Sequence, residues 1–348
     1  MIKINKTIEV VRSSSALLNS LTLVSAKAVT ALLQQHYARV SMTDVSTPAD
    51  LAALVARNPD LVFLGVKFVP TDVELGMNDP HKVWVAEYLS DNGIANTGSN
   101  QYAHELELDK SLAKQRVYAA GLATSPFYVA KYDVVQYKSD MVLQFPLFVK
   151  PTNRGGGAGI DARSVVNTRT ELAAKVQSIS SIYQADSLVE QYLSGREFSV
   201  AILKKEDKPG YAVMPLELIA PMNEDGARIL SAQVKCDDTE RVVEVTDIVL
   251  RAKVTKLAMS VFTALGARDY GRIDIRLDSK GIPQFLEANL IPSLIAGYGS
   301  FPKACMLNLG LAYEPMILRI VRLGLMRQGN RGQDAPELDS VGGVLQAV

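Results

Sequence analysis

Short apolar runs alternate with helix-like stretches over the first hundred residues of the chain. Leu61–Val66 is a continuous apolar run, which is typical of a parallel strand buried on both faces. Thr47 followed by Pro48 has the residue types of a helix N-cap and a first helical position. Strands that alternate with helices imply right-handed βαβ crossovers and a doubly wound parallel sheet. We therefore predict a Rossmann-like lobe over residues 1–108, with strands at 7–11, 40–45 and 61–66 and helices at 16–36, 48–56 and 81–89.

Beyond residue 108 the pattern changes to longer strands, hairpin-like alternation and Gly-rich connections, which indicates an α+β body. Thr168–Glu171 has the S/T-x-x-E form of a capping box and should begin a helix. The stretch from Arg327 onward is rich in Gly, Gln, Asp and Pro and shows no periodicity, so we expect a flexible tail over 327–348. We divide the remainder into a central lobe, 109–205, and a C-terminal lobe, 206–326. The predicted elements of these lobes are strands at 147–150, 187–190, 197–203, 211–219, 272–278 and 283–289 and helices at 168–180 and 247–265.

The composition narrows the classes of function. The 348 residues include 37 Lys plus Arg and 37 Asp plus Glu, so the formal net charge is zero, which argues against a dedicated nucleic-acid binder. No apolar run reaches the roughly 18 residues needed to cross a bilayer, and the N-terminus lacks the pattern of a signal peptide. Cys236 and Cys305 form no CxxC pair, which argues against a disulfide scaffold or a structural zinc site. We expect a cytoplasmic protein that acts on small molecules and has neither a nucleic-acid nor a membrane partner.

A Gly-rich segment follows a predicted strand at residues 148–160. The strand ends at Lys150, and four glycines occur in the five residues 155–159. Backbone without Cβ atoms can approach a polyphosphate closely and donate several N–H groups, while a lysine supplies a point charge. A flexible surface hairpin is the alternative. No P-loop motif occurs, and the G-x-G-x-x-A match at 157–162 leads into a predicted strand, whereas a dinucleotide site needs a helix. A loop that covers the phosphates of a nucleotide fits the segment better.

Two predicted strands near the C-terminal end bring oxygen-bearing side chains together. Side chains two residues apart on a strand share a face, so Arg272 and Asp274 point one way while Ile273 enters the core. Glu287 and Asn289 share a face of the next strand for the same reason. If the two strands pair as a hairpin, both carboxylates and the amide converge beside the arginine, and such oxygen ligands suit Mg²⁺. The alternative is a solvated hairpin face with a salt bridge.

A third segment, Glu190–Glu197, joins two predicted strands through a turn and carries two carboxylates seven residues apart, although a simple turn is the alternative. Taken together, in this order and at these separations, the three segments resemble the ATP-grasp ligases, and among them the D-alanine–D-alanine ligases. The resemblance extends over about residues 10–325. It implies an α/β ATP-grasp fold with an N-terminal Rossmann-like lobe, an ADP-forming ligase that makes C–N bonds, ATP with two Mg²⁺ ions or with Mn²⁺, and a homodimer.

The resemblance also implies roles for individual residues, carried over position by position. The implied nucleotide-binding residues are Lys110, Lys150, Gly156 and Gly157 at the phosphates, Glu190 and Leu193 at the adenine, and Glu197 at the ribose. The implied metal ligands are Asp274, Glu287 and Asn289. The implied catalytic residues are Arg272, which stabilises charge at the reacting centre, and Lys235, which matches a lid lysine in a segment that aligns poorly.

Positions that touch the amino-acid substrates in these ligases differ in this chain. Ser13 stands where the resemblance implies a glutamate, and Gly156 and Gly299 stand where it implies serines. The loop between Asn289 and Phe301 is one residue longer. We expect its aliphatic residues Leu290, Ile291, Leu294 and Ile295, with Tyr298, to line a less polar pocket, better suited to a ring-bearing substrate than to alanine.

These observations leave three classes of function. They are a cell-wall D-alanine–D-alanine ligase, a specialised ligase of a small-molecule pathway, and a non-catalytic ATP-binding subunit. The retained lysine and metal positions argue against the third class, and the altered substrate positions argue against the first. We therefore predict a specialised ligase that phosphorylates a carboxylate or an enolised ketone and condenses it with an amino-acid amine. The relative that joins an amino acid to mycosporine-glycine is an example.

Overall fold

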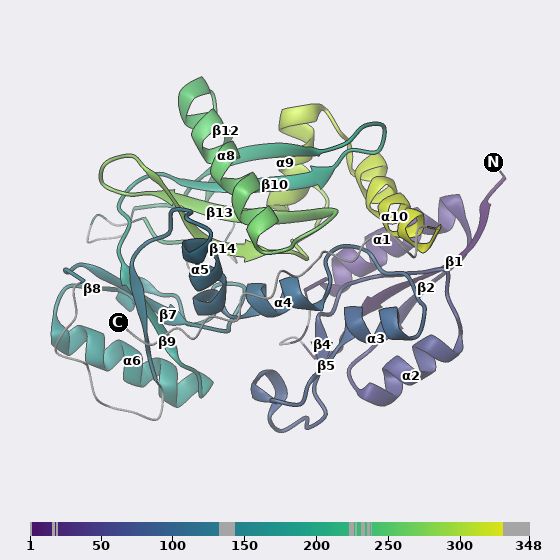
Figure 1. Ribbon diagram of the computed structural model, residues 1–348, viewed down its shortest axis with the longest axis horizontal. Helices are drawn as coiled ribbons and strands as arrows, with labels where there is room; N and C mark the ends of the chain where they lie inside the picture. Colours follow the sequence, from purple (N-terminus) through teal and green to yellow (C-terminus); the bar gives the residue numbers. More distant parts are fainter. Residues whose placement is uncertain are drawn as a thin grey trace.

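The computed structural model describes residues 2–15, 18, 20–131, 143–222, 226, 228–230, 234, 237 and 239–329. Within these residues the strands form sheets of three, two, four and five strands. Figure 1 shows the N-terminal lobe on the right, the four-stranded sheet at the lower left and the five-stranded sheet above them.

The N-terminal lobe contains a parallel sheet with helices on both faces. Its elements are β1 (Ile4–Arg12), α1 (Leu23–His36), β2 (Tyr37–Asp44), α2 (Pro48–Ala56), β3 (Leu61–Phe63), β4 (Phe68–Val69), η1 (Gly76–Asn78), β5 (Val83–Trp84), α3 (Val85–Asp91) and α4 (Gln101–Leu108). The strand order is β2–β1–β3, and all pairs are parallel. Val10 packs with residues of α1, whereas Val11 packs with residues of α2 and α3, because neighbouring strand residues face opposite sides of a sheet. This is the doubly wound arrangement that the sequence predicts.

Several element boundaries in this lobe differ from the prediction, and strands β1 and β2 each begin three residues earlier than expected. Helix α1 begins at Leu23 rather than at residue 16, because Thr22 is the N-cap and its side chain accepts the backbone N–H of Ser25. Strand β3 ends at Phe63 rather than at 66. Helix α3 begins at Val85 rather than at 81, because the two preceding residues pair with β4 as strand β5. Helix α2 matches its predicted range, with Thr47 in a capping box.

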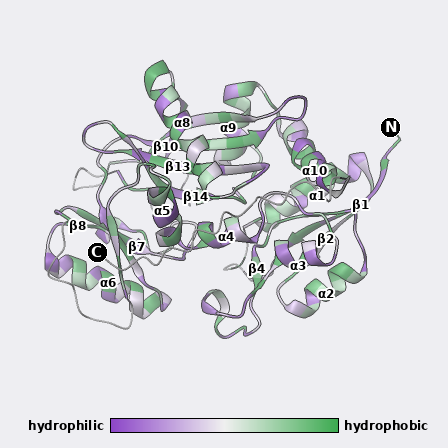
Figure 2. Ribbon diagram, viewed as in Figure 1, coloured by the Kyte–Doolittle hydropathy of each residue, from purple (hydrophilic) through white to green (hydrophobic). Residues whose placement is uncertain are grey.

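The central lobe is an antiparallel sheet with the order β6–β9–β7–β8, covered by one long helix. Its elements are α5 (Lys110–Ala119), β6 (Phe127–Ala130), β7 (Leu147–Pro151), η2 (Ala162–Ser164), β8 (Val165–Val166), α6 (Arg169–Tyr183) and β9 (Ser187–Gln191). Leu172, Val176 and Ile179 of α6 pack against the sheet, which explains why Figure 2 shows this helix banded with hydrophobic and hydrophilic residues. The strand expected from residue 163 is only two residues long, because Asp161 caps a 3₁₀ turn before it.

The C-terminal lobe is a five-stranded antiparallel sheet with the order β12–β11–β10–β13–β14. Its elements are β10 (Glu197–Lys204), β11 (Tyr211–Ile219), β12 (Arg241–Glu244), α8 (Ile248–Ala264), β13 (Tyr270–Leu277), β14 (Pro283–Asn289), α9 (Ser300–Leu309) and α10 (Tyr313–Gly329). Since β10 pairs with both β11 and β13, the expected boundary at residue 205 falls inside the β10–β11 hairpin. Helix α10 continues to residue 329, so the stretch from 327 begins as helix, and the rest of the expected tail lies outside the described residues.

The two faces of the five-stranded sheet have different environments. Ile273, Ile275 and Leu277 of β13 pack against α8, as predicted from the alternation. The residues between them, Arg272, Asp274 and Arg276, lie on the opposite face and line a cavity. The period of two along the strand therefore places charged side chains on the cavity side of a strand whose other side belongs to the core.

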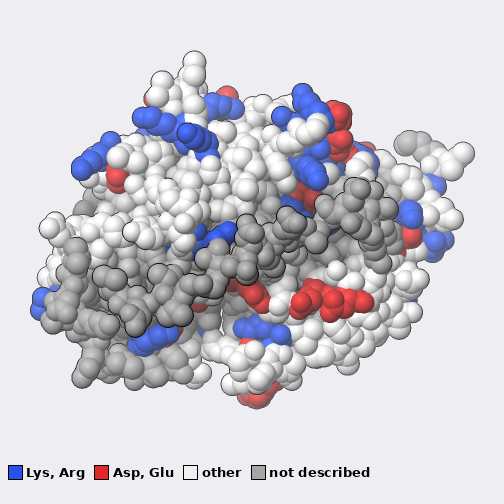
Figure 3. Space-filling view, in the orientation of Figure 1, with Lys and Arg blue, Asp and Glu red and all other residues white. Residues whose placement is uncertain are grey.

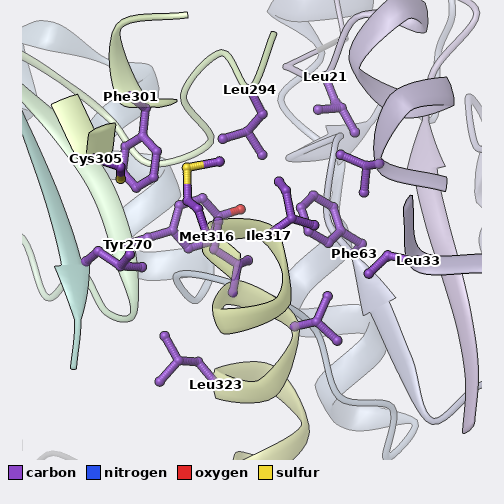
Figure 4. Close-up of a cluster of buried hydrophobic side chains, with 14 of the residues drawn as sticks. Leu21, Leu33, Phe63, Tyr270, Leu294, Phe301, Cys305, Met316, Ile317 and Leu323 are labelled. Atoms are coloured by element: carbon purple, nitrogen blue, oxygen red, sulfur yellow. The ribbon is translucent and has the colours of Figure 1, made fainter. Parts of the chain in front are cut away.

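Helix α10 packs between the N-terminal and C-terminal lobes, in the largest hydrophobic cluster of the described residues. Figure 4 shows Met316 and Ile317 of this helix between Phe63 of the N-terminal lobe and Tyr270 of the C-terminal lobe. Cys305 lies in the same cluster, fully buried, and burial raises the pKa of its thiol to about 12. The cysteine is therefore a packing residue of the core.

In the described part of the chain, no single helix is long and apolar enough to cross a membrane. Helices α9 and α10 pass that test only as a pair, and they meet at a bend of 105°. Figure 3 shows the described Lys/Arg and Asp/Glu side chains in separate small groups of both signs on the face in view.

Candidate active site

A cavity of about 540 Å³ lies between the two antiparallel sheets and extends to the N-terminal lobe. Its size is within the usual range for ligand pockets, roughly 300–1,000 Å³. The residues predicted from the sequence that line it are Lys110, Lys150, Gly156, Glu190, Leu193, Glu197, Arg272, Asp274, Glu287 and Asn289. Gly157 is buried beside the cavity and does not line it, and Lys235 lies outside the described residues. Three separate segments of the sequence are thus brought to one cavity.

Glu190 of β9 holds two lysines at one wall. Its carboxylate lies 2.8 Å from Nζ of Lys150 and 2.8 Å from Nζ of Lys114, and all three side chains are buried. Burial alone would raise the pKa of Glu190, but the two ammonium groups lower it to about 2. Burial also opposes the charge of Lys150, but Glu190 and Glu287 raise the pKa of this lysine. Lys150 therefore carries its positive charge at the cavity surface.

Lys110 begins helix α5 and faces the same space. Its backbone N–H donates to the carbonyl of Thr152, which joins the start of the helix to the end of β7, and Asp109 caps the helix. Its Nζ lies 3.9 Å from Oε2 of Glu287 and donates to the carbonyl of Arg154. Burial lowers the pKa of Lys110 to about 8, against the attraction of Glu287. This lysine therefore adds a second cation near the Gly-rich segment.

The Gly-rich segment borders the cavity, and three of its glycines have positive φ angles, which residues with a side chain rarely adopt. Gly156, Gly157 and Gly159 have φ angles of +65°, +85° and +76°. A Cβ at Gly159 would lie 2.5 Å from the ring of Pro151, whereas one at Gly156 would meet no atom within 4 Å. The conformation alone therefore favours glycine at position 156, and no neighbouring atom fills the space where a side chain would lie.

Strands β13 and β14 pair as the predicted hairpin and bring the oxygen ligands together. Asp274 is the direct partner of Glu287, and Arg272 is the partner of Asn289. Arg272 donates from Nε and Nη2 to the two oxygens of Asp274 at 2.9 and 2.8 Å, and Ser199 donates to Oδ1 at 3.0 Å. Burial opposes the charge of Arg272, but Asp274 raises its pKa.

The donor set of this hairpin suits a hard cation. Asp274, Glu287 and Asn289 contribute only oxygen ligands, and all three line the cavity. Two of these ligands are carboxylates and the third is an amide. Among the described residues, no cluster of three or more His, Cys, Asp or Glu side chains is arranged to hold a metal ion. The set fits Mg²⁺, which binds through one or two carboxylates and completes its shell with phosphate and water.

Aromatic and aliphatic groups form another wall of the cavity at the β9–β10 connection. Tyr192 stacks on Phe148 with ring centroids 6.5 Å apart, and the guanidinium of Arg276 lies 5.4 Å from the Tyr192 ring. Arg276 also donates from Nη1 to Glu197 at 3.2 Å. Leu193 beside them is buried. A planar base can lie against such a surface, while Glu197 offers acceptors to hydroxyl groups.

Ser13 and Gly299 stand at positions where the similar ligases carry other residues, and the structure places them differently relative to the cavity. Ser13 is fully buried, lies 2.9 Å from the hydroxyl of Ser46, accepts the N–H of Ser15 and does not line the cavity. Gly299 does line it, and a Cβ there would lie 2.6 Å from the carbonyl oxygen of Ser293. A serine at position 299 would therefore require the backbone of this loop to shift.

The expected apolar pocket is only partly formed by the loop after Asn289. Ile291 and Tyr298 line the cavity, whereas Leu290 and Leu294 belong to the two large cores. The prediction was wrong for these two leucines, because the loop turns them away from the cavity. Ser300, one residue after Gly299, lines the cavity instead and lies 3.3 Å from Nη1 of Arg272.

Sequence reasoning missed several charged residues at the cavity. Glu107 of α4 accepts from Nζ of Lys67 and from the N–H of Leu290, both at 2.7 Å, and it lies 3.1 Å from Nδ1 of the fully buried His104. Burial would raise the pKa of Glu107, but Lys67 and His104 lower it. Lys114, which lies behind the cavity wall and contacts Glu190, was missed as well. The i, i+3 spacing of His104 and Glu107 is visible in the sequence. No sequence pattern indicates that Lys67 and Leu290 also contact Glu107.

The fold has close counterparts among solved structures. The D-alanine–D-alanine ligase of Bacillus anthracis complexed with ATP matches with a TM-score of 0.72 over 94% of this chain and 100% of that chain, at 19% sequence identity. This likeness confirms the predicted α/β ATP-grasp fold. The cavity between the two antiparallel sheets lies within that fold.

The family follows from the sequence. The family model described as D-ala D-ala ligase C-terminus matches residues 117–322, which is more than half of the chain, and the chain belongs to this family. A D-alanine–D-alanine ligase from Glaesserella parasuis is 29% identical and aligns with 68% of this chain and 74% of its own length. One from Xylella fastidiosa is 28% identical and aligns with 86% and 93%. The protein is therefore an ATP-grasp ligase, of the class that forms C–N bonds and releases ADP, and the predicted family and enzyme class are confirmed.

Proposed function

We propose that this ligase binds ATP and Mg²⁺, or Mn²⁺, in the 540 Å³ cavity and joins an amino-acid amine to an acid or an enolised ketone in a specialised small-molecule pathway. The addition of an amino acid to mycosporine-glycine is an example of such a reaction. One contrast supports the proposal: the nucleotide side of the cavity keeps the predicted charged residues, whereas Ser13 is turned away from it and Gly299 excludes a serine. We also propose a cytoplasmic homodimer, on the resemblance alone.

ATP would lie between the two sheets. Lys110 and Lys150 would bind the phosphates under the Gly-rich segment, and the backbone N–H groups around Gly156 and Gly157 would add donors. The adenine would lie at the Glu190–Leu193 wall, and Glu197 would accept from the ribose hydroxyls. Lys235, which the resemblance matches to a lid lysine, is proposed as a catalytic residue.

Asp274, Glu287 and Asn289 would hold the metal. When bound, Mg²⁺ neutralises charge that develops on the transferred phosphoryl group. Arg272 keeps Asp274 in place through two hydrogen bonds, so the arginine and the metal-binding carboxylate act as one unit.

The chemistry needs positioning and charge stabilisation, not a covalent side-chain nucleophile. The acceptor oxygen attacks the γ-phosphorus of ATP, the bond to the β–γ bridging oxygen breaks, and ADP is formed. The amine then attacks the activated carbon, and Arg272 donates to the oxygen on which negative charge develops. The carbon–oxygen bond to phosphate breaks, the amine loses a proton, and phosphate leaves with the bonding electrons.

A Lys150→Met variant is expected to raise the dissociation constant for ATP by about 30-fold, equal to about 2 kcal/mol. Methionine keeps the length of the stem but not the charge at the phosphates. Equilibrium binding of ATP with Mg²⁺ measures the effect. Lys175→Met is the matched control, because Lys175 is also a buried lysine, paired with Asp161 at 2.8 Å, and does not line the cavity. Equal affinity of wild type and Lys150→Met would remove Lys150 from the nucleotide site.

Purified protein with ATP, Mg²⁺ and D-alanine is expected to form ADP at a rate at least about 100-fold below that with its own substrates, because lost substrate contacts cost about 1–3 kcal/mol each. The measurement is an ADP-release screen over pairs of acids or ketones with amino acids, followed by mass analysis of the products. D-alanyl-D-alanine as the leading product would instead support the alternative, a cell-wall D-alanine–D-alanine ligase, which the names of the relatives favour.

A further inference from the structure

Lys114 is a completely buried lysine on helix α5 that lies behind the cavity wall and does not line the cavity. Its Nζ lies 2.8 Å from three oxygens, those of Thr124 Oγ1, Ser125 Oγ and Glu190 Oε2, and 3.3 Å from the carbonyl oxygen of Phe285. These partners come from the segment before β6, from β9 and from β14. One ammonium group thus joins three elements that surround the nucleotide side of the cavity.

The surrounding hydrogen bonds require Lys114 to act as a donor. Thr124 donates its own hydroxyl hydrogen to the carbonyl of Phe285 at 3.0 Å, and Ser125 donates its hydrogen to Oε2 of Glu190 at 2.8 Å. Both hydroxyl oxygens are therefore left to accept from Lys114. Burial lowers the pKa of Lys114, and Glu190 acts against this. The three N–H groups of the ammonium form match the three near acceptors.

Glu190 is shared between this buried cluster and the cavity. Its Oε2 lies against Lys114 and Ser125, while its Oε1 lies 2.8 Å from Nζ of Lys150. A carboxylate buried to this extent keeps its position only while its charge is paired and hydrogen-bonded. Without Lys114, Glu190 would keep Ser125 on Oε2 and would be drawn toward Lys150. The ammonium of Lys150 would then be held more tightly by Glu190 and offered less freely to a phosphate.

We propose that Lys114 is a positioning residue for nucleotide binding: it fixes the carboxylate of Glu190 and thereby sets the orientation of Lys150 toward the phosphates. The inference rests on the proposed role of Lys150 as a ligand of ATP. Phe285 lies two residues before Glu287, and its carbonyl keeps the bond from Thr124 when Lys114 is replaced. The effect of Lys114 is therefore directed at Glu190 and Lys150 and not at the metal-binding strand.

A double-mutant cycle on ATP affinity tests this assignment. Lys114→Met is expected to raise the dissociation constant for ATP in the presence of Mg²⁺ by about 10-fold, the effect of one charge-assisted hydrogen bond. In a Lys150→Met background the same change is expected to raise it by less than about 2-fold, because the group through which Lys114 acts is gone. Lys175→Met, which removes a buried lysine of the same lobe, is expected to leave the affinity unchanged while lowering thermal stability.

The possible results separate the inference from the proposed function. A wild type that does not bind ATP would overturn the proposed function itself. A wild type that binds ATP, with Lys114→Met unchanged or with equal effects of this change in both backgrounds, would overturn the positioning role alone and leave Lys114 as a residue of stability. If Lys114→Met does not fold, Ser125→Ala replaces it, because Ser125 bonds both Lys114 and Glu190. Its expected increase is about 3-fold, and this increase should also be absent in the Lys150→Met background.

Discussion

The Glu287→Gln variant is expected to form ADP about 100-fold or more slowly than the wild type, with an unchanged melting temperature. Glu287 lines the cavity opposite Asp274 on the paired strand, and its side chain is partly exposed, so an amide of the same size fits without a packing change. The substitution removes one of two anionic ligands proposed for the metal. A loss of about 3 kcal/mol of charge stabilisation at the phosphates corresponds to roughly 100-fold in rate.

The same carboxylate also balances the cations of the cavity. It raises the pKa of Lys150 and of Arg272, and it opposes the loss of charge that burial imposes on Lys110. The glutamine variant is therefore expected to lower the pKa of Lys110 and of Lys150 even before a metal is considered.

Glu244→Gln on β12 is the matched control, since Glu244 is exposed, pairs only loosely with Arg251 at 3.7 Å and does not line the cavity. Turnover is measured by ADP release with ATP and Mg²⁺ varied and the substrates of the wild type held at saturation. Near-wild-type turnover of Glu287→Gln at ordinary Mg²⁺ would exclude Glu287 from the metal site.

Local patterns in the sequence predicted the hairpin of the site well. The alternation Arg272–Ile273–Asp274 predicts which side chains enter the core. The turn signal at Ser279–Gly281 predicts that the following strand pairs with this one as a hairpin. The observed register, with Asp274 opposite Glu287, also depends on a shift of the pairing between Asp274 and Ile275, which neither signal predicts. The starts of α2 and α6 were predicted equally well, because Thr47 and Thr168 cap these helices with their own side chains, whereas the cap of α1 at Thr22 was not recognised.

The missed parts depend on contacts between residues far apart in the chain. Lys114 and Phe285 are 171 residues apart, and Glu107 and Leu290 are 183 residues apart. A buried lysine on a helix looks like any surface lysine until the fold brings a carboxylate to it. In the same way, the leucines of the loop after Asn289 could be recognised as apolar, but only the path of the loop decides whether they face the cavity or the core.

The largest effect on the rate is expected from Arg272→Met, which should lower turnover by about 1,000-fold, at the scale of losing a charge-stabilising donor. Methionine retains much of the stem, so the change removes the guanidinium from the cavity and the two hydrogen bonds that hold Asp274. Ser199 continues to bond Asp274 at 3.0 Å, which keeps this carboxylate near its position. ATP affinity is therefore expected to change by less than about 3-fold, within 0.7 kcal/mol.

The role of Arg272 is tested by measuring the reaction rate and the affinity for ATP of the same variant. Single-turnover formation of the ligated product reports the step in which the amine attacks, and equilibrium binding reports the nucleotide site. Arg196→Met is the matched control, because Arg196 forms the same two-bond pair with Glu217, at 2.7 and 2.7 Å, outside the cavity. If Arg272→Met loses ATP affinity in proportion to its loss of rate, the arginine serves ATP binding. A loss of rate with ATP still bound places its charge at the reacting oxygen, because only an interaction that strengthens in the transition state lowers the barrier without changing binding.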